Sequence, residues 1–532
     1  MPLPSAIAAR LDRHDDAALA ARFRSARGEE VAARIFARDD RLWGPPGQPE
    51  VADRLGWLDI ADRMAAELDD LRAFAASVRA DGLRHAVVLG MGGSSLAPEV
   101  FRRSFGTRDG GLLLHVLDST DPAAVRDLEA AIDPDDTLFV VSSKSGTTIE
   151  TTAALARFWR LSGERGDRFV AITDPGTPLA ALAARRRFRR IFLNDPEIGG
   201  RYSALSYVGL VPAALAGADL DELVGRAVAL GRELREEDPE DNPGLWLGCV
   251  LGELARRRRD KLTFLVDPSI ASFGLWVEQL VAESLGKRGM GIVPVADEPV
   301  GAPEAYGNDR VFLHLHDDEH ARDDSALGRL AEAGLPVIAL PVSGPEDLGR
   351  LMLLLEFATA VAGWVLGVNP FDQPNVQAAK DKTAEVLAGE PPRIKPGGPE
   401  ALRALLDAGP PSYLAIQAYL PPSPALDGAI ADLRAEIRDR TMMATTFGYG
   451  PRYLHSTGQL HKGGPPVGRF LQLVAEHEAD IPVPGEPYTF GALERAQADG
   501  DLLVLREQGL PVERIVVRGD PVEAVRRLEE TL

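Results

Sequence analysis

The chain has 532 residues, of which 45% are hydrophobic and 26% are charged, and its formal net charge at pH 7 is −21. This composition is ordinary for folded domains and argues against disorder, and the length suffices for two or three domains. The negative charge argues against nucleic acid as a partner, because phosphate backbones are bound by basic surfaces. An anionic substrate would need a local nest of positive charge or of hydrogen-bond donors.

Two features bear on the compartment of the protein. The single cysteine, Cys249, excludes an intramolecular disulfide and fits a reducing cytoplasm, and we expect it to be a small buried residue rather than a nucleophile. Charges interrupt the opening residues, which lack a signal-peptide pattern. The apolar run at 351–368 is long enough to cross a membrane, but Glu356 interrupts it and no basic flank follows. We therefore expect a cytoplasmic protein with a buried helix there and no membrane contact.

Residues 1–80 have the amphipathic spacing of helices and are expected to form an N-terminal helical segment. After them the pattern changes to short apolar runs separated by helical stretches, which indicates βαβ units and a parallel sheet. These runs lie at residues 85–90, 112–118, 137–143, 168–173 and 190–193. The pattern predicts a first α/β domain over residues 81–240.

A second set of apolar runs begins near residue 262 with LTFLV and continues with GIVPV, VFLHLH and PVIAL. It predicts a second α/β domain over residues 241–532. Two later runs, DLLVLRE and ERIVVRG, are expected to be strands that complete its sheet. The predicted fold class is therefore α/β, with two domains that each hold a mainly parallel sheet between layers of helices.

The segment VVLGMGGSSLAPEVF places a glycine-rich turn between a predicted strand and a predicted helix. Glycine lets the backbone approach a ligand and a helix N-terminus binds anions, so Gly93 and Ser94 are candidate binding residues. Ser95 stands at the sixth position, so the spacing differs from the G-x-G-x-x-G of dinucleotide-binding turns. Taken alone, the turn is equally consistent with a structural connection.

The segment VVSSKSGTTIETTAAL again runs from a strand through a turn into a helix. Its hydroxyls, one lysine and a helix N-terminus together predict an anion-binding nest. The binding candidates are Ser143, Lys144, Ser145, Thr147 and Thr148. The alternative is a Ser/Thr-rich helix cap, although one cap needs only one hydroxyl. The G-x-x-x-x-G-K-[ST] frame of a Walker loop is missing, so a sugar phosphate fits better than a nucleotide.

These two turns resemble known motifs. SSKSGTT resembles the phosphate loop of sugar isomerase (SIS) domains, and GMGGSSL resembles a turn of the glucose-6-phosphate isomerase (phosphoglucose isomerase) family. Three further segments resemble signatures of the same family: EIGGRYSALSYVGLVPAAL at 197–215, EQLVAESLGKRG at 278–289 and NPFDQPNVQAAK at 369–380. The resemblance spans some 290 residues and implies two SIS-type domains.

The resemblance also implies roles for single residues. Glu283 matches the carboxylate that moves a proton between C2 and C1 of the opened sugar. Gln279 lies one helical turn earlier, on the same face, and can contact the substrate. Arg201 matches the arginine that stabilises the negative charge of the enediolate. Lys380 follows NPFDQ at the family's spacing and is implied in opening the sugar ring; a solvated lysine is the alternative.

The family's catalytic histidine is not in its usual place between the glutamate segment and NPFDQ. That interval holds HLHDDEH, which also invites a metal-site interpretation, though an acidic turn after a strand explains it better. The later stretch LHSTGQLHKGG resembles the family's histidine context and puts His455 in the catalytic position, with His461 as the reserve candidate. The histidine segment is therefore predicted to be displaced towards the C-terminus.

The resemblance implies an isomerase that interconverts glucose 6-phosphate and fructose 6-phosphate without a metal or organic cofactor. It implies a homodimer in which a second subunit lends the histidine, and the displaced segment leaves the donor open. The order of segments resembles the isomerase half of transaldolase fusions, although no transaldolase segment is present in the sequence. The alternatives are an isomerase that also accepts mannose 6-phosphate, and a non-catalytic phosphosugar-binding protein.

Overall fold

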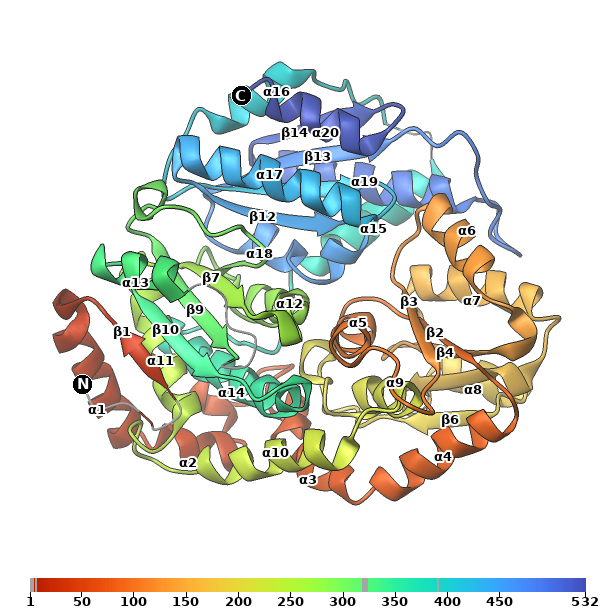
Figure 1. Cartoon of the computed structure of the whole chain (residues 1–532), viewed down its shortest axis with the longest axis horizontal. Helices are drawn as coiled ribbons and strands as arrows, with labels where there is room; N and C mark the ends of the chain where they lie inside the picture. The colour runs from red at the N-terminus through yellow and green to blue at the C-terminus, as the bar shows by residue number, and fades with distance from the viewer. Residues whose placement is uncertain (1–3, 5–6, 318–323, 390–391) are drawn as a thin grey trace.

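The computed structural model describes residues 4, 7–317, 324–389 and 392–532. Within these residues the strands form three sheets, each flanked by helices (Figure 1). This confirms the predicted fold class of parallel α/β sheets between helices. The third sheet was not expected. The boundaries placed at residues 80 and 240 stay predictions.

The first sheet is wholly parallel, in the order β3-β2-β4-β5-β6. Its strands are β2 (His85–Leu89), β3 (Leu113–Leu117), β4 (Thr137–Ser142), β5 (Phe169–Thr173) and β6 (Arg190–Leu193). Its helices are α5 (Gly93–Phe105), α6 (Pro122–Ala131), α7 (Ile149–Leu161), α8 (Pro178–Arg185) and α9 (Tyr207–Ala216). The strand order reverses between β2 and β4, so the turns that follow these two strands meet at one edge, where parallel sheets bind ligands.

The second sheet has the order β1-β10-β9-β7-β8. Its strands are β1 (Ala8–Arg10), β7 (Lys261–Val266), β8 (Val293–Val295), β9 (Arg310–His316) and β10 (Val337–Pro341). Strand β1 pairs antiparallel with β10, and the other pairs are parallel. Its helices are α10 (Leu220–Glu233), α11 (Pro243–Arg256), α12 (Phe273–Leu285), α13 (Asp324–Glu332) and α14 (Leu348–Leu366).

The third sheet is parallel, in the order β12-β11-β13-β14, and corrects a prediction. Its strands are β11 (Tyr413–Tyr419), β12 (Ala444–Tyr449), β13 (Gly468–Ala475) and β14 (Val512–Val517). Its helices are α15 (Val376–Ala388), α16 (Pro399–Leu406), α17 (Pro424–Thr441), α18 (Gly458–Gly463), α19 (Phe490–Glu507) and α20 (Pro521–Glu529). ERIVVRG is a strand of this separate sheet. DLLVLRE is wrong as a strand, because it is the last part of α19.

The N-terminal segment is helical, as expected, apart from β1. Its helices are α1 (Asp16–Gly28), α2 (Val31–Phe36), α3 (Ile60–Ala65) and α4 (Leu68–Ala80). One hydrophobic cluster contains Trp57 from this segment, Phe101 from α5, Trp246 from α11 and Leu354 from α14. The N-terminal segment and the first two sheets therefore share one continuous core.

Helix α14 is the central buried helix of the second sheet. The helical stretch at Pro345–Leu366 is long and apolar enough to cross a membrane, but 89% of its apolar window is buried inside the protein. That burial is typical of a core helix. Glu356 lies in it fully buried, and both carboxylate oxygens lack a hydrogen-bond partner among the described residues. Burial raises the pKa of the Glu356 carboxyl well above its usual value, which favours the protonated form.

Replacing this carboxyl by its neutral amide is expected to stabilise the protein at alkaline pH. The unfolded chain ionises Glu356 near its usual pKa of 4.5 whereas the folded chain holds the proton longer, so stability falls as pH rises through that interval. We expect Glu356→Gln to gain about 1–3 kcal/mol at pH 8 and less at pH 5. Thermal unfolding at both pH values measures the gain.

The control is Glu332→Gln, which changes an exposed glutamate of α13. It should leave the unfolding midpoint of the protein unchanged at both pH values. A Glu356→Gln variant that loses stability at pH 8 would show that the carboxylate has a favourable role in the core.

Candidate active site

The turn after β2 lies directly against three other segments that resemble the family, those of Gln279, His455 and Gly200. Gly92 has a φ of 55°, and a Cβ placed on it would lie 2.8 Å from the carbonyl oxygen of His455 and 3.0 Å from the Gln279 amide nitrogen. A Cβ on Gly93 would lie 2.0 Å from the Gly200 carbonyl oxygen. Only glycine fits at these two positions, because the neighbours are mostly backbone. The predicted residue Ser94 belongs to the first turn of α5.

The turn after β4 is built from hydroxyl hydrogen bonds. The Oγ of Ser143 lies 3.0 Å from the Thr148 Oγ1 and accepts from the Gly146 N–H, and the Oγ of Ser145 lies 3.0 Å from the Thr147 Oγ1. Thr148 is the residue before the first turn of α7. The hydroxyls are thus gathered at the N-terminus of the helix, an arrangement that favours phosphate binding, and residues 143–148 are called the anion-binding turn below.

Lys144 differs from the other predicted binding residues of this turn. Its ammonium nitrogen lies 2.5 Å from the Asp174 Oδ2 and donates to the Pro196 carbonyl oxygen at 2.8 Å. The side chain is thus committed to the loops after β5 and β6. In this structure Lys144 is tied to the border of the anion-binding turn, while its neighbours Ser145 and Thr147 line the cavity beside it.

Glu283 is fixed between an arginine and an amide. The Nη1 of Arg201 lies 3.0 Å from the Glu283 Oε1, and the Gln279 amide donates to the Glu283 Oε2 at 3.1 Å. Glu283 and Gln279 are one turn apart on α12, and Arg201 lies in the short 3-10 helix η7 (Gly200–Tyr202). The Arg201 side chain is 2% exposed, so its charge acts with little screening by water.

Arg201 also connects the glutamate segment to the NPFDQ segment. Its Nε donates to the Ser284 Oγ at 2.9 Å, and its Nη1 donates to the Gln373 amide oxygen at 2.9 Å. Its Nη2 donates to the backbone carbonyls of Pro370 and Asp372. Arg201 therefore holds three of the segments that resemble the family in a fixed geometry.

His455 reaches the same site from the third-sheet region of the same chain. The Gln279 amide that contacts Glu283 also donates to the His455 carbonyl oxygen at 2.7 Å. The His455 Nε2 lies 2.8 Å from the Glu150 Oε1, and the Gln497 amide donates to that oxygen at 2.6 Å. The displaced histidine segment thus places His455 beside Gln279, with its ring nitrogen facing α7.

His461, the reserve candidate, lies elsewhere. It is 6% exposed, its Nδ1 is 3.3 Å from the Gln417 amide nitrogen, and its ring packs edge-on against Phe470 of β13. Burial lowers the pKa of His461 to about 3, so it is neutral at physiological pH. This histidine belongs to the core beneath the third sheet.

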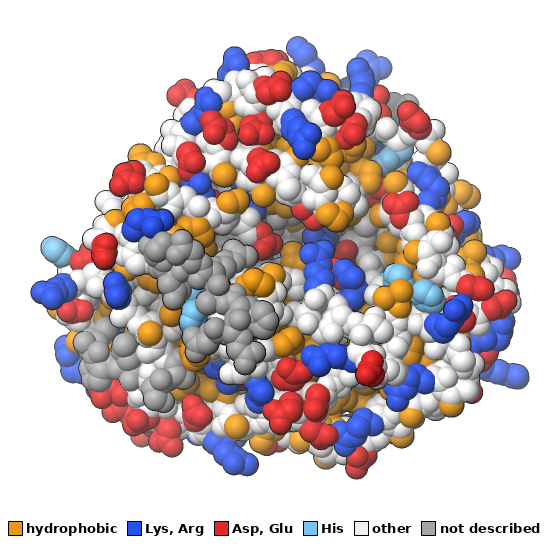
Figure 2. Space-filling view, viewed as in Figure 1, with side chains coloured by type: hydrophobic (Ala, Val, Ile, Leu, Met, Phe, Trp, Pro, Cys, Tyr) orange, Lys and Arg blue, Asp and Glu red, His pale blue; other side chains and the backbone are white. Residues whose placement is uncertain are grey.

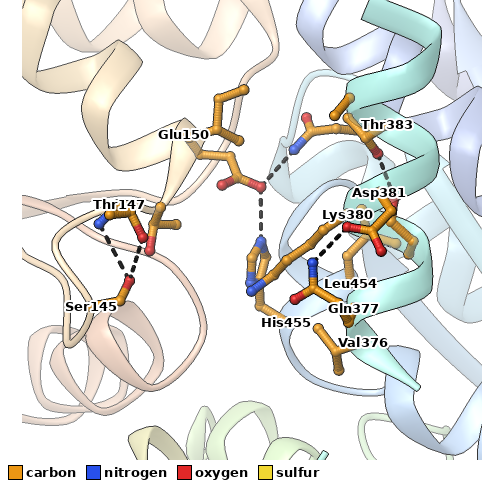
Figure 3. A pocket seen from close by; sticks show the side chains of 15 residues that line it. Ser145, Thr147, Glu150, Val376, Gln377, Lys380, Asp381, Thr383, Leu454 and His455 are labelled. Atoms are coloured by element: carbon orange, nitrogen blue, oxygen red, sulfur yellow. Dashed lines mark hydrogen bonds and ion pairs between the residues drawn. The ribbon is translucent and has the colours of Figure 1, made fainter. Parts of the chain in front are cut away.

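A cavity of about 410 Å³ lies between the anion-binding turn and helix α15. Ser145 and Thr147 line one side, and Lys380 and His455 line the other (Figure 3). Thr148 also lines the cavity. Lys380 is an exposed residue of α15 that reaches across the cavity beside His455 (Figure 3). The cavity therefore brings the predicted phosphate-binding residues and two predicted acid–base residues to one space.

Two ionisable groups of the site were missed by sequence reasoning. Burial raises the pKa of the Glu150 carboxyl, but the charge and hydrogen bond of His455 outweigh it, so the pKa lies below its usual value. Burial and then the charge of Arg201 lower the pKa of Lys287 to about 7, although its ammonium lies 2.7 Å from the Asp372 Oδ1. Glu150 could have been found, because it stands in the first turn of the helix after the anion nest.

A second hollow borders α12 near Glu278 and is not lined by Glu283. Figure 2 shows Lys and Arg side chains around a hollow near the centre of the face of the molecule that is in view. A pocket of about 460 Å³ between α5, α12 and α17 is lined by Arg103, Arg434, Arg452 and Glu278 among others. Burial, and then the charge of Asp297, raise the pKa of Glu278 to about 8, so this glutamate is largely protonated at neutral pH.

The histidine-rich stretch HLHDDEH is only partly described, because its last three residues lie outside the described residues. The His314 Nε2 lies 3.2 Å and the His316 Nδ1 lies 3.4 Å from the Asp267 carboxylate. Asp267 is therefore a third potential ligand, which spacing along the sequence did not reveal. None of the four described residues of the stretch, 314–317, lines the cavity beside His455.

Parallel sheets whose edge carries an anion-binding turn, a paired carboxylate and arginine, and a histidine held by a glutamate define an α/β enzyme with an acid–base site. Residues 58–297 match the family model described as phosphoglucose isomerase. The glucose-6-phosphate isomerase of Rubrobacter xylanophilus is 33% identical over 413 residues, which cover 66% of this chain and 91% of that protein. The chain belongs to the phosphoglucose isomerase family, as its motifs predicted.

Further similar proteins agree. The glucose-6-phosphate isomerase of Thermus thermophilus is 31% identical over 410 residues, which cover 68% of this chain and 94% of that protein. The crystal structure of a hypothetical protein from Thermus thermophilus matches with a TM-score of 0.61 and 29% identity, over 72% of this chain and all of that one. Both matches extend over more of the chain than residues 58–297.

The two histidines are expected to differ in their effect on stability. His461→Ala removes a buried ring that packs against Phe470, so we expect a loss of about 2–4 kcal/mol. His455→Ala removes a ring at the edge of the cavity, and the loss should be below about 1.5 kcal/mol. Chemical denaturation of both variants measures the difference. Equal losses would contradict the burial of His461.

Proposed function

We propose that the chain interconverts glucose 6-phosphate and fructose 6-phosphate by opening the sugar ring and moving a proton through a cis-enediol. The observation that carries the proposal is the Gln279 amide, which donates both to the Glu283 carboxylate and to the His455 carbonyl. It ties the base for proton transfer to the histidine for ring opening. The anion-binding turn follows β4 and lies at the same edge of the first sheet as the turn after β2, which contacts Gln279 and His455.

The phosphate is bound by the turn before α7. The hydroxyls of Ser145, Thr147 and Thr148 line the cavity, and the free N–H groups of the helix add their dipole. These neutral donors explain how a chain with a net charge of −21 binds an anion. Lys144 adds positive charge from the border, where it is paired with Asp174.

Ring opening requires one group that accepts a proton and one that donates it. Glu150 favours the His455 tautomer with its proton on Nε2, which leaves Nδ1 as the acceptor. Lys380, which lines the same cavity, is the partner that supplies a proton to the ring oxygen. Glu150 therefore orients the imidazole, and the imidazole reaches the sugar.

The proton then moves between C2 and C1. Glu283 takes it from one carbon and returns it to the other, while Arg201 stabilises the negative charge on the enediolate oxygen. The hydrogen bonds of Arg201 to backbone carbonyls fix its position before the substrate arrives. This chemistry is an internal proton transfer and needs neither an organic cofactor nor a metal.

We extend the proposal to the assembly and the compartment. The expected state is a homodimer in the cytoplasm, and the single buried cysteine supports a reducing compartment. Because His455 of the chain itself lies beside Gln279, the site does not depend on a second subunit for its histidine. A relation to transaldolase fusions rests on the order of the segments alone.

Loss of the carboxylate of Glu283 should abolish isomerisation. Glu283→Gln keeps the shape of the side chain but removes the base, so we expect kcat for fructose 6-phosphate to fall by roughly 10³-fold or more. A coupled assay of glucose 6-phosphate formation measures it, and mannose 6-phosphate tested in parallel defines the substrate range. The matched control is Glu278→Gln on the same helix, which mimics a glutamate that is already largely protonated.

Equal activity of wild type and Glu283→Gln would refute the role of the base. An inactive wild type that still binds glucose 6-phosphate would identify the chain as a phosphosugar-binding protein instead.

The histidine and its glutamate partner should act as one unit. His455→Ala and Glu150→Gln should each lower kcat by about 10²-fold, and the double variant should lose little more, because both remove the same proton transfer. His461→Ala should keep kcat per folded molecule. Activity assays normalised to the folded fraction test this. If kcat falls in His461→Ala but not in His455→Ala, the catalytic histidine is His461 and the assignment of His455 is wrong.

A further inference from the structure

Three potential metal ligands meet where the third-sheet region contacts the first domain. Asp121 precedes α6, His477 follows β13, and Glu494 lies in the second turn of α19. One ligand atom of each lies within 4.8 Å of the others. Asp121 is fully buried and Glu494 is 2% exposed, so water does not freely solvate these carboxylates. The cluster is separate from the cavity that holds His455 and Lys380.

Two carboxylate oxygens in this cluster lack a hydrogen-bond partner among the described residues. The Asp121 Oδ1 caps α6 by accepting from the N–H groups of Ala123 and Ala124, which leaves Oδ2 buried and unpartnered. Glu494 meets the His477 Nε2 with one oxygen, while its Oε1 is also buried and unpartnered. Two buried carboxylates with open oxygens are costly unless they take up protons or a cation joins them, and a cation relieves both at once.

The nearby charged side chains are engaged elsewhere. The Asp480 carboxylate accepts from the N–H groups of Ile481 and Gly491 and from the Thr489 hydroxyl. It therefore shapes the loop before α19. The guanidinium of Arg126 donates to the Ala479 carbonyl at 3.2 Å. Neither group supplies a hydrogen bond to the two open carboxylate oxygens.

We propose that Asp121, His477 and Glu494 bind a divalent transition-metal ion, with Zn²⁺ as the best fit. One imidazole nitrogen and two carboxylate oxygens match the donors that Zn²⁺ takes in proteins, and a water completes four ligands. The bound ion compensates both buried carboxylates. The site lies outside the isomerisation chemistry and does not depend on the proposed function.

The position of the ion gives it a structural role. Ile481, Val483, Phe490 and Leu493 pack into the core of the first domain, so the segment between β13 and α19 is already seated on that domain. Figure 1 shows this segment running out beside α6. The ion would join the start of α6 to α19 by coordinate bonds.

This cross-link borders the active site through one residue. Gln497 lies one turn after Glu494 on α19, accepts from the hydroxyl of Thr120 at 2.9 Å, and donates to Glu150 at 2.6 Å. Thr120 is next to Asp121 in the chain. A bound metal would therefore restrain α19, which carries Gln497, and the residue next to Thr120, which contacts Gln497. Gln497 in turn holds Glu150, the partner of His455.

The test is metal binding by the full-length chain. The protein is stripped with a chelator, dialysed against Zn²⁺, and assayed for bound metal by mass spectrometry and for thermal unfolding. We expect bound Zn²⁺ and a rise of about 2 °C or more in the unfolding midpoint. Asp121→Asn preserves the helix cap and Glu494→Gln preserves the shape, and each should remove one equivalent of Zn²⁺ and abolish the rise.

The controls are two other histidines. His14→Gln changes an exposed histidine, and His316→Gln changes the second histidine cluster. Both variants should keep the equivalent that Asp121→Asn loses. The proposal is overturned if stripped wild type takes up no Zn²⁺, or if Asp121→Asn and Glu494→Gln, checked for folding by circular dichroism, both bind as much as wild type. Isomerase activity is not the readout, so its absence would not affect this result.

Discussion

The amide of Gln279 is the interaction on which the site depends. Its two hydrogen bonds join a glutamate on a helix of the second sheet to the backbone of a histidine that comes 176 residues after Gln279 itself. The turn at Gly92 leaves no room for a side chain between them. The position of the displaced segment is thereby set by backbone contacts, so the imidazole is free to pair with Glu150.

Electrostatics explains how an acidic protein can hold the proposed anion site. Most of its negative charge lies at the surface, whereas the site uses hydroxyls, a helix N-terminus and a buried arginine. Three cations around the site are restrained: Lys144 by Asp174, Arg201 by Glu283, and Lys287 by Asp372. Paired cations keep their place without substrate, and short-range hydrogen bonding replaces a long-range attractive field.

The sequence predicted the segments that depend on local chemistry. Gly93, Ser145 and Thr148 follow strand ends, and parallel strands bring such ends together without knowledge of distant contacts. The third sheet was missed, because its strands β11, β12 and β13 were not predicted, and the predicted β14 carries no signal for which sheet it joins. DLLVLRE was misassigned because α19 is buried on several faces there, which hides its helical period. Gln497 and Lys287 were missed because their importance arises only from tertiary contacts.

Strand β1 has a consequence for how the chain acquires its structure during synthesis. It pairs with β10, whose residues are about 330 positions later, whereas the first sheet uses only residues 85–193. The first sheet can assemble while translation continues. Strand β1 has no partner until β10 has left the ribosome, so the second sheet is completed later. The N-terminal arm is then the last element to dock on that sheet, and it covers an edge that would otherwise be available to a neighbouring chain.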